Sequence, residues 1–307
     1  MRKLLRRLPE PLVDVLRSSR KRYRSVRYRA RERLRPVSVD RAAVAEAFRA
    51  AGVGEGDAVF LQTKMSAFGT IEGGPDTVIA ALEDVVGGEG LIAMPAFPLD
   101  RPALDYLRED HVFDLLETPS RMGAITERFR TAPGSERSLH PTHSVSARGP
   151  GAAELVAGHG EAETPFGEGT PFAALIDRDA HQVWFGSGAA AFTMYHAYEC
   201  LREPSFPIPV FLPERLSARC VDAQRREVVV QTLVHDPRVA ARRIDSNPAI
   251  EARVRARLID GGMRSVRLGR GEILAQPLPE MLVELERMLS EGMTIYPPEL
   301  LEEARAA

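Results

Sequence analysis

Residues 58–95 read AVFLQTKMSAFGTIEGGPDTVIAALEDVVGGEGLIAMP and carry the pattern that decides the fold. The stretch begins with a short apolar run, Ala58–Gln62, and ends with a second one, Leu91–Pro95. Between them lie a loop of small and polar residues and a helical pattern over Asp76–Val86, which a proline precedes and a glycine pair ends. Strand, loop, helix and strand in this order predict a βαβ unit and therefore an α/β protein.

The alternation of helical and strand patterns continues along the rest of the chain. Residue patterns predict helices over Arg41–Ala51, Gly123–Arg130, Ala152–Gly158, Phe192–Leu201, 247–260 and 279–291, and strands over Gln182–Phe185, 208–221 and 226–235, with a hairpin-like stretch at 263–276. Residues 98–121 are polar and irregular, and we expect them to form a loop on the substrate side.

Composition places the chain among soluble globular proteins. Its 307 residues are 44% apolar and 27% charged. No apolar run approaches the roughly 20 residues of a membrane helix, and the first residues lack the apolar stretch of a secretory signal. The two cysteines, Cys200 and Cys220, have no metal-ligand spacing, and we expect free thiols in a reducing cytoplasm.

Charge is divided unevenly along the chain. Residues 1–36 hold 14 Lys and Arg and three acids, a net charge of +11, whereas residues 37–307 carry −13. We expect the first segment to be a basic N-terminal arm that contacts anionic lipid at the membrane periphery, a protein partner or a second subunit, and we expect no nucleic acid. The acidic body suits a cationic substrate. Ordinary solvated surface would explain both charges equally well.

Two loops combine small residues with polar groups. In residues 61–82 a strand end opens into a glycine-rich loop that feeds a helix, which presents backbone N–H groups to an anionic ligand. Neither a P-loop nor a G-x-G-x-x-G fingerprint is present, so a plain surface loop is the alternative. Residues 140–151, HPTHSVSARGPG, suit hydrogen bonds to phosphate or to a pantetheine arm, or a stabilised turn. Two histidines without a nearby carboxylate or cysteine argue against a metal.

His196 and Glu199 form a third candidate element. If Phe192–Leu201 is helical, the two side chains are three residues apart and share one face. A carboxylate beside an imidazole fixes its orientation and raises its pKa, and both effects suit a general base. A histidine and a glutamate that merely pair on a helix surface would show the same spacing.

Five stretches of the chain follow one another in a recognisable order between residues 62 and 199. They are Gln62–Leu82, Gly90–Phe97 (GLIAMPAF), Arg137–Ser144 (RSLHPTHS), Thr164–Phe172 (TPFGEGTPF), and the pair His196 and Glu199. Together they resemble the motifs of the aminoglycoside 3-N-acetyltransferase family. The first motif departs from the family's serine-rich pattern at Lys64, Met65 and Ala67.

The resemblance implies a fold and an activity. It implies an α/β fold in which a single mixed-sheet domain, residues 37–307, is wrapped by helices. It also implies that acetyl-CoA is the co-substrate and that the acceptor is a small-molecule amine on an aminoglycoside or amino-sugar-like substrate. The lack of a convincing ligand cluster in the sequence predicts that no metal is used. Transfer would be direct, with a general base and no acyl-enzyme.

The resemblance also assigns roles to individual residues. His196, oriented by Glu199, is the candidate base, and His143 is its competitor as base or oxyanion donor. The candidate acetyl-CoA-binding residues are Thr63, Lys64, Ser66, Gly69, Thr70, His140, Ser144 and Thr170. Arg137 or Arg148 would meet phosphate through a planar guanidinium.

Two other classes of function remain open at this point. A hydrolase or acyltransferase with a nucleophilic serine or cysteine is disfavoured because no G-x-S-x-G elbow is present. A catalytically silent sugar- or CoA-binding scaffold of the same fold would show the same motifs without turnover.

Overall fold

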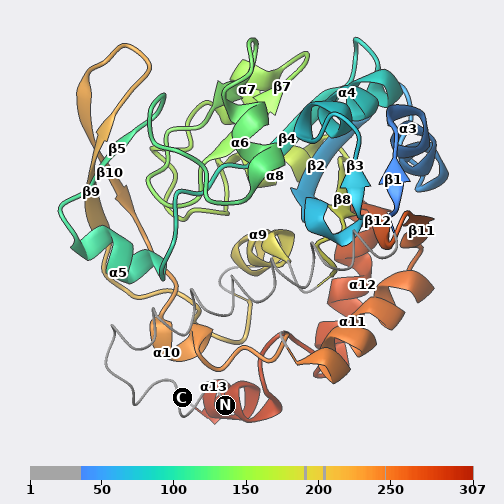
Figure 1. The fold of residues 1–307 in the computed structure, drawn as a ribbon. Coiled ribbons are helices and arrows are strands. Elements are labelled where there is room, and N and C mark those ends of the chain that lie inside the picture. Colours follow the sequence, from blue (N-terminus) through green and yellow to red (C-terminus); the bar gives the residue numbers. More distant parts are fainter. Residues whose placement is uncertain (1–35, 190–191, 203–204, 246, 307) are drawn as a thin grey trace.

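A mixed sheet of seven strands organises the protein (Figure 1), whose computed structural model describes residues 36–189, 192–202, 205–245 and 247–306. In spatial order the strands are β11 (Arg264–Leu268), β12 (Gly271–Pro277), β8 (His181–Phe185), β2 (Ala58–Thr63), β4 (Leu91–Pro95), β7 (Val145–Arg148) and β6 (Glu136–Arg137). The central β8, β2 and β4 are parallel, and the outer strands are antiparallel. The sheet takes strands from both sides of residue 150, which confirms the single mixed-sheet α/β fold. The predicted arm lies, apart from Pro36, outside the described residues.

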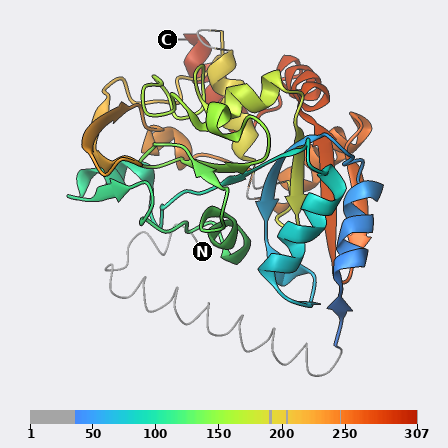
Figure 2. The ribbon, with the colours of Figure 1, turned by 90° about the horizontal axis from the view of Figure 1, so that it is seen from above.

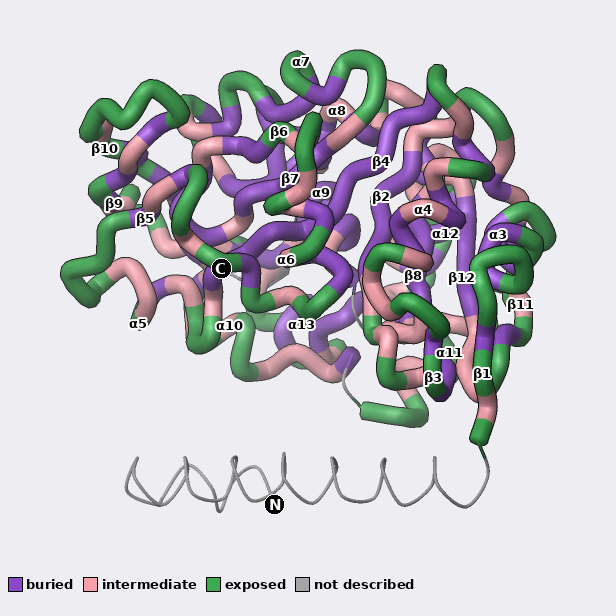
Figure 3. Tube along the Cα trace, turned by 45° about the horizontal axis from the view of Figure 1, so that its top comes forward, coloured by how far each residue is buried: buried purple, intermediate pink, exposed green. Residues whose placement is uncertain are grey.

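Helices cover both faces of this sheet because its strands are apolar on both sides. Val59 and Leu61 point to one face, where they pack with helices α3 (Arg41–Ala50), α4 (Pro75–Val86) and α6 (Ala124–Arg130). Phe60 and Trp184 point to the other face, which α7 (Ala152–Val156), α8 (Pro171–Asp177), α9 (Thr193–Leu201), α11 (Pro248–Asp260), α12 (Leu278–Ser290) and α13 (Pro298–Ala306) cover. Figure 2 shows α3 and α4, in blue and teal, on the side of the strands away from α9. Figure 3 shows the central strands as continuous buried segments.

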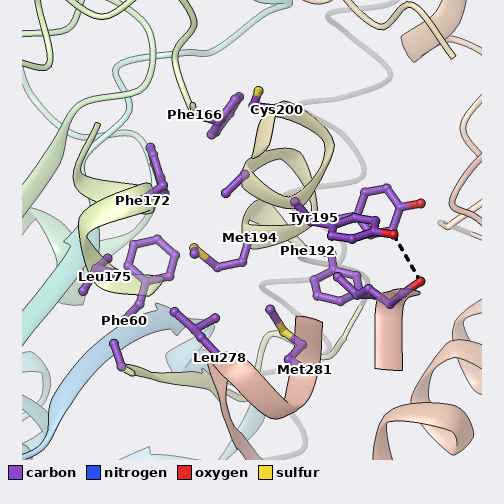
Figure 4. Packing of buried hydrophobic residues seen from close by; sticks show 14 of the residues in the cluster. Phe60, Phe166, Phe172, Leu175, Phe192, Met194, Tyr195, Cys200, Leu278 and Met281 are labelled. Atoms are coloured by element: carbon purple, nitrogen blue, oxygen red, sulfur yellow. Dashed lines mark hydrogen bonds between the residues drawn. The ribbon is translucent and has the colours of Figure 1, made fainter. Parts of the chain in front are cut away.

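Helix α9 is buried almost all round, because it lies between the sheet and the C-terminal helices. Seven of its nine residues, Met194 to Cys200, are buried. In Figure 4, Met194 points from α9 toward Phe60 of the sheet and Leu278 of α12. Both cysteines are buried thiols that form no disulfide in the described structure, which agrees with the prediction of thiols. Despite this burial, no helix in the described part of the chain combines the length and the apolar character needed to cross a bilayer.

Two smaller sheets lie beside the main one. β10 (Glu227–Thr232), β9 (Leu216–Val221) and β5 (Val112–Asp114) form one, and β1 (Ser38–Val39) pairs with β3 (Thr70–Ile71) in the other. The prediction of an irregular loop over residues 98–121 was wrong, because α5 (Ala103–Arg108) and β5 lie within it. Both are too short to show a period in the sequence. The short helices η1 (Met65–Ala67) and α10 (Pro237–Ala240) complete the described elements.

We predict that Gly149→Ala destabilises the protein. Gly149 follows β7 with φ of +118°, and a Cβ atom there would lie 2.2 Å from the carbonyl oxygen of Gly90. Backbone strain and overlap together should lower the free energy of unfolding by about 2–4 kcal/mol. Chemical denaturation measures this, with Gly88→Ala as the control, because nothing lies within 4 Å of a Cβ at Gly88. Equal losses in the two variants would contradict the prediction.

Candidate active site

Helix α9 places the His196–Glu199 pair inside the protein. The two residues are one turn apart, and His196 Nδ1 lies 2.7 Å from Glu199 Oε2. The side chain of Glu199 is completely buried and that of His196 is 10% exposed. The pair is therefore an interior hydrogen bond, which excludes the alternative of an ordinary surface pair on a helix.

Residues far away in the sequence complete the surroundings of this pair. His235, just before α10, has its Nε2 3.7 Å from Glu199 Oε2, and its ring centroid is 4.4 Å from that of His196. Arg243 Nη1 lies 2.9 Å from His196 Nε2. Asp245 holds the same guanidinium through Nε and Nη2, at 3.3 and 2.5 Å.

These contacts fix the tautomer of His196. A guanidinium only donates hydrogen bonds, so His196 Nε2 is the acceptor and Nδ1 carries the proton that is donated to Glu199. The lone pair that a general base needs is therefore on Nε2. Arg243 occupies that lone pair in this structure.

The protonation states follow from burial and from the neighbouring charges. Burial lowers the pKa of His196, and this effect outweighs the opposing influence of Glu199. The expectation that the carboxylate would raise the imidazole pKa is thus wrong for the net shift, because a charged imidazole loses its hydration here. Burial alone would raise the pKa of Glu199, but His196 and His235 outweigh it and hold that pKa below its usual range. At neutral pH the site holds a neutral imidazole and an ionised carboxylate.

Phe166 brings the third predicted catalytic residue, His143, into the same cluster. The Phe166 ring centroid lies 4.7 Å from that of His143, 5.3 Å from His196 and 5.7 Å from His235. His143 Nδ1 lies 2.9 Å from the hydroxyl of Thr142, and burial lowers its pKa well below the usual value. His143 and His196 thus contact the same aromatic ring.

Three of the predicted acetyl-CoA contacts are buried and bonded to the protein itself. His140 Nδ1 accepts from the backbone N–H of His143, and its Nε2 lies 3.1 Å from Thr232 Oγ1. Ser144 donates to the carbonyl of Ala96, and Thr170 caps α8. A direct contact with acetyl-CoA would require these side chains to give up those bonds, so they shape the loops that surround the site.

The other predicted contacts lie at the carboxyl ends of the parallel strands, where open α/β sheets bind ligands. Thr63, Lys64, Ser66 and Thr70 are partly or fully exposed, whereas Gly69 is buried. Gln62 donates to Thr193 at the start of α9, which ties this edge of the sheet to the helix that carries His196. Gly69 has φ of +101°, and a Cβ there would lie 2.8 Å from the carbonyl oxygen of Val37.

Both arginines considered for phosphate already have partners. All three guanidinium nitrogens of Arg137 donate to the protein, among them to the carbonyls of Leu115 and Ala96. Arg148 forms an ion pair with Glu83. Neither arginine therefore offers a pair of unbonded guanidinium N–H groups to a phosphate in this structure.

His196, Glu199 and His235 also form the one group in the described part of the chain whose ligand atoms lie close enough, within 4.8 Å, to hold a metal ion. The positive guanidinium of Arg243 against His196 opposes a second cation. Both ring nitrogens of His196 are already engaged, Nδ1 by Glu199 and Nε2 by Arg243. We therefore interpret the group as a hydrogen-bonded acid–base cluster.

Comparison with known proteins decides which family this site belongs to. The family model described as aminoglycoside 3-N-acetyltransferase matches residues 60–290, which includes the sheet, α9 and both loops. The chain belongs to the aminoglycoside 3-N-acetyltransferase family. The resemblance drawn from the five motifs is thereby confirmed.

Curated members of this family show moderate identity over part of their length. Aminoglycoside N(3)-acetyltransferase VII of Streptomyces paromomycinus is 35% identical over 178 residues, which are 54% of this chain and 62% of that protein. Aminoglycoside N(3)-acetyltransferase IX of Micromonospora chalcea is 36% identical over 165 residues, or 50% and 58% of the two chains. The match thus spans less than two thirds of the length of either relative.

Solved structures of the family share the fold over nearly their whole length. Aminoglycoside acetyltransferase AAC(3)-Xa has a TM-score of 0.74 at 23% identity, covering 88% of this chain and 99% of that one. AAC-IIIb, solved as a binary complex with CoASH, has a TM-score of 0.69 at 23% identity, covering 85% and 100%. AAC-VIa bound to sisomicin has a TM-score of 0.68 at 25% identity, covering 83% and 98%.

Reasoning from the sequence missed three residues of the cluster. His235 and Arg243 are 36 and 44 residues beyond Glu199, and Tyr296 follows α12. Burial and the negative charge of Glu199 raise the pKa of Tyr296, which places its hydroxyl beside that carboxylate. No spacing rule links such distant residues, because only the folded chain brings them to α9.

We predict that acid destabilises this protein through its buried neutral histidines. Burial lowers the pKa of His140, His143, His159 and His196. Below the ordinary imidazole pKa of about 6.5 the unfolded chain takes up protons that the folded chain does not, so stability is lost as pH falls. His159, with a pKa of about 4, should by itself cost about 2 kcal/mol between pH 7.5 and pH 5.

Denaturation curves at several pH values measure this loss. His159→Gln should reduce the pH dependence, because it removes one of these buried imidazoles. A free energy of unfolding that stays constant from pH 7.5 to pH 5 would contradict the prediction.

Proposed function

We propose that this protein transfers an acetyl group from acetyl-CoA to an amine of an aminoglycoside or of a related amino sugar, without a metal ion. The observation that carries the proposal is the buried, neutral His196 bonded to ionised Glu199 in a chain of this family. The names of the relatives support the acceptor class, as does the neighbour bound to sisomicin. The neighbour solved with CoASH supports the donor.

In this proposal His196 is the general base. An ammonium group first loses one proton to water, since only the free amine has a lone pair for attack. His196 Nε2 accepts a further N–H proton as the amine attacks the thioester carbon, and it passes that proton to the departing thiolate. Glu199 stabilises the imidazolium that exists between these steps. Arg243 must release Nε2 before the first of these proton transfers.

The carboxyl ends of β2, β4 and β8 are the proposed binding edge for acetyl-CoA. Thr63, Lys64 and Ser66 are accessible there and offer hydroxyls and a positive charge to the pantetheine arm and the phosphates. Thr70 lies further along the same loop, and Gly69 allows its turn. His140, Ser144 and Thr170 support this edge from within.

The proposed acceptor side is a hollow of about 280 Å³ between α5 and β9. Glu109 and Asp110 line it together with Pro141, which lies two residues before His143. Glu109 forms an ion pair with Arg101, and Asp110 forms one with Arg219. The ammonium groups of a polycationic acceptor would displace these arginines and bind the two carboxylates in their place.

Thiol release from acetyl-CoA in the presence of sisomicin and a panel of other aminoglycosides and amino sugars tests the proposed function. We expect release only when an acceptor is present, and no loss of rate after treatment with a chelator. Stabilisation by CoA in a thermal-shift assay without any thiol release would favour the silent binding protein. Activity that is lost on chelation and restored only by zinc would contradict the metal-free mechanism.

Single substitutions at His196 and His143 test which histidine is the base. We predict that His196→Ala lowers kcat by about 10²–10⁴-fold, with a much smaller effect on acetyl-CoA affinity. Glu199→Gln should cost less, because it keeps the imidazole. The rate of the wild-type protein should rise with pH below pH 6.5, where His196 loses its proton, and the Ala variant should lack this limb. If His143→Ala loses the limb and His196→Ala keeps it, the two roles are reversed.

Deleting residues 1–35 tests whether the basic arm is separate from the acetyltransferase domain. We expect kcat and acetyl-CoA binding to be unchanged, because the described sheet and the His196 cluster are formed by later residues. The deletion keeps β1, whose backbone pairs with β3 beside Gly69. A truncated protein that unfolds normally on heating yet no longer binds CoA would show that the arm belongs to the site.

A further inference from the structure

Among the residues that the structure describes, Arg243 is the one cation in direct contact with the proposed base. Its Nη1 lies 2.9 Å from His196 Nε2, and its other two nitrogens are held by Asp245. Because Asp245 holds Nε and Nη2, Nη1 is the nitrogen that remains to donate toward His196 Nε2. The side chain of Arg243 is 28% exposed, so its charge is only partly screened by water.

The position of Nη1 matters because of where charge develops in acetyl transfer. The amine nitrogen has to stand within hydrogen-bond reach of Nε2 and, at the same time, against the thioester carbon. The carbonyl oxygen of that thioester then becomes negative a few ångströms from Nε2. A donor for this oxygen has to lie in the space that Arg243 Nη1 borders.

We propose that Arg243 is a catalytic residue that stabilises the oxyanion of acetyl transfer, an inference that rests on the proposed function. In the free protein Nη1 donates to Nε2 and keeps the lone pair of His196 on the reactive nitrogen. When the amine takes that place, Nη1 moves to the carbonyl oxygen while Asp245 keeps hold of Nε and Nη2. The guanidinium thus sets the tautomer of His196 in the free protein and donates a hydrogen bond to the carbonyl oxygen during the reaction.

The electrons and protons of the step balance. The amine lone pair forms the C–N bond, and the π pair of the carbonyl moves onto the oxygen, which accepts a hydrogen bond from Nη1. An N–H proton goes to His196 Nε2. The oxygen pair then re-forms the carbonyl and breaks the C–S bond, and the thiolate takes the proton from Nε2. Arg243 stays protonated throughout, since its pKa is raised by Asp245 despite the opposing effect of burial.

Several charged or hydrogen-bonding groups surround His196 in the described structure. Glu199, His143 and His235 face it beside Arg243, whereas Tyr296 contacts Glu199 and Asp245 holds Arg243. Tyr296 donates its hydroxyl hydrogen to Glu199, and among the described residues neither that hydroxyl nor the two other imidazoles forms a hydrogen bond with His196 Nε2. Arg243 alone combines that contact with a permanent positive charge.

Arg243→Gln, assayed with an acceptor that the wild-type protein acetylates, tests the inference. We expect kcat to fall by about 10²–10³-fold, the usual effect of removing an oxyanion donor, with little change in the KM for acetyl-CoA. The pH limb of His196 should persist and move to higher pH, because the guanidinium lowers the pKa of that imidazole. Arg243→Lys should keep part of the rate, and Asp245→Asn should lose less than Arg243→Gln.

Arg238 supplies the matched control. It is held by Asp236 through the same two nitrogens and the same two-residue spacing, but it is 85% exposed and lies away from His196. Arg238→Gln should keep the wild-type kcat.

Three results would overturn the inference. They are a wild-type kcat in Arg243→Gln, an equal loss in Arg238→Gln, and disappearance of the pH limb in Arg243→Gln, which would mean that Arg243 acts only by orienting the base. An NMR titration of the His196 ring gives a readout independent of turnover, and an unchanged pKa in Arg243→Gln would also count against it. If the wild-type protein releases no thiol with any acceptor, it is the proposed function that fails.

Discussion

The structure depends on stabilising one ionised carboxylate, the side chain of Glu199, which is fully buried on helix α9. Glu199 has no exposed surface, and a buried charge without partners is strongly destabilising. His196, on the same helix, donates to its Oε2 at 2.7 Å, and His235 and Tyr296 approach it from other segments. The segments that carry His235 and Tyr296 therefore help to stabilise this charge, and α11, α12 and α13 bury the apolar face of the sheet.

The sheet and the charged cluster depend on each other through few residues. Gln62 links the end of β2 to the start of α9, and Phe166 packs its ring against His143, His196 and His235. A rigid aromatic ring between imidazoles sets their separation, because core side chains pack without room to drift. The carboxyl edge of the parallel strands and the imidazole of His196 are thereby held at fixed positions relative to each other.

Local patterns allowed most of the fold to be predicted. Leu91–Pro95 was predicted to the residue, and the helix before it differs by a single position, because buried parallel strands and capped helices leave strong local patterns. Strands β6 and β7, of two and four residues, left no such pattern, nor did α5. The His196–Glu199 pair follows from helical spacing, but its burial does not. The direction of its pKa shift was consequently missed, and so were His235 and Arg243, whose contacts join distant parts of the chain.

The order of strands in the sheet bears on how the protein is made. Strand β8, in the middle of the chain, pairs on one side with β2 and on the other with β12, which the ribosome delivers some ninety residues later. Until then α12 cannot pack against α9. The apolar residues of α9 and Glu199 are therefore exposed to water or bound by a chaperone. Strands so distant in the sequence pair slowly, because the entropy cost of closing the loop comes before the stabilising contacts form. The site is therefore assembled late in biogenesis, and incomplete chains emerging from the ribosome carry no formed base.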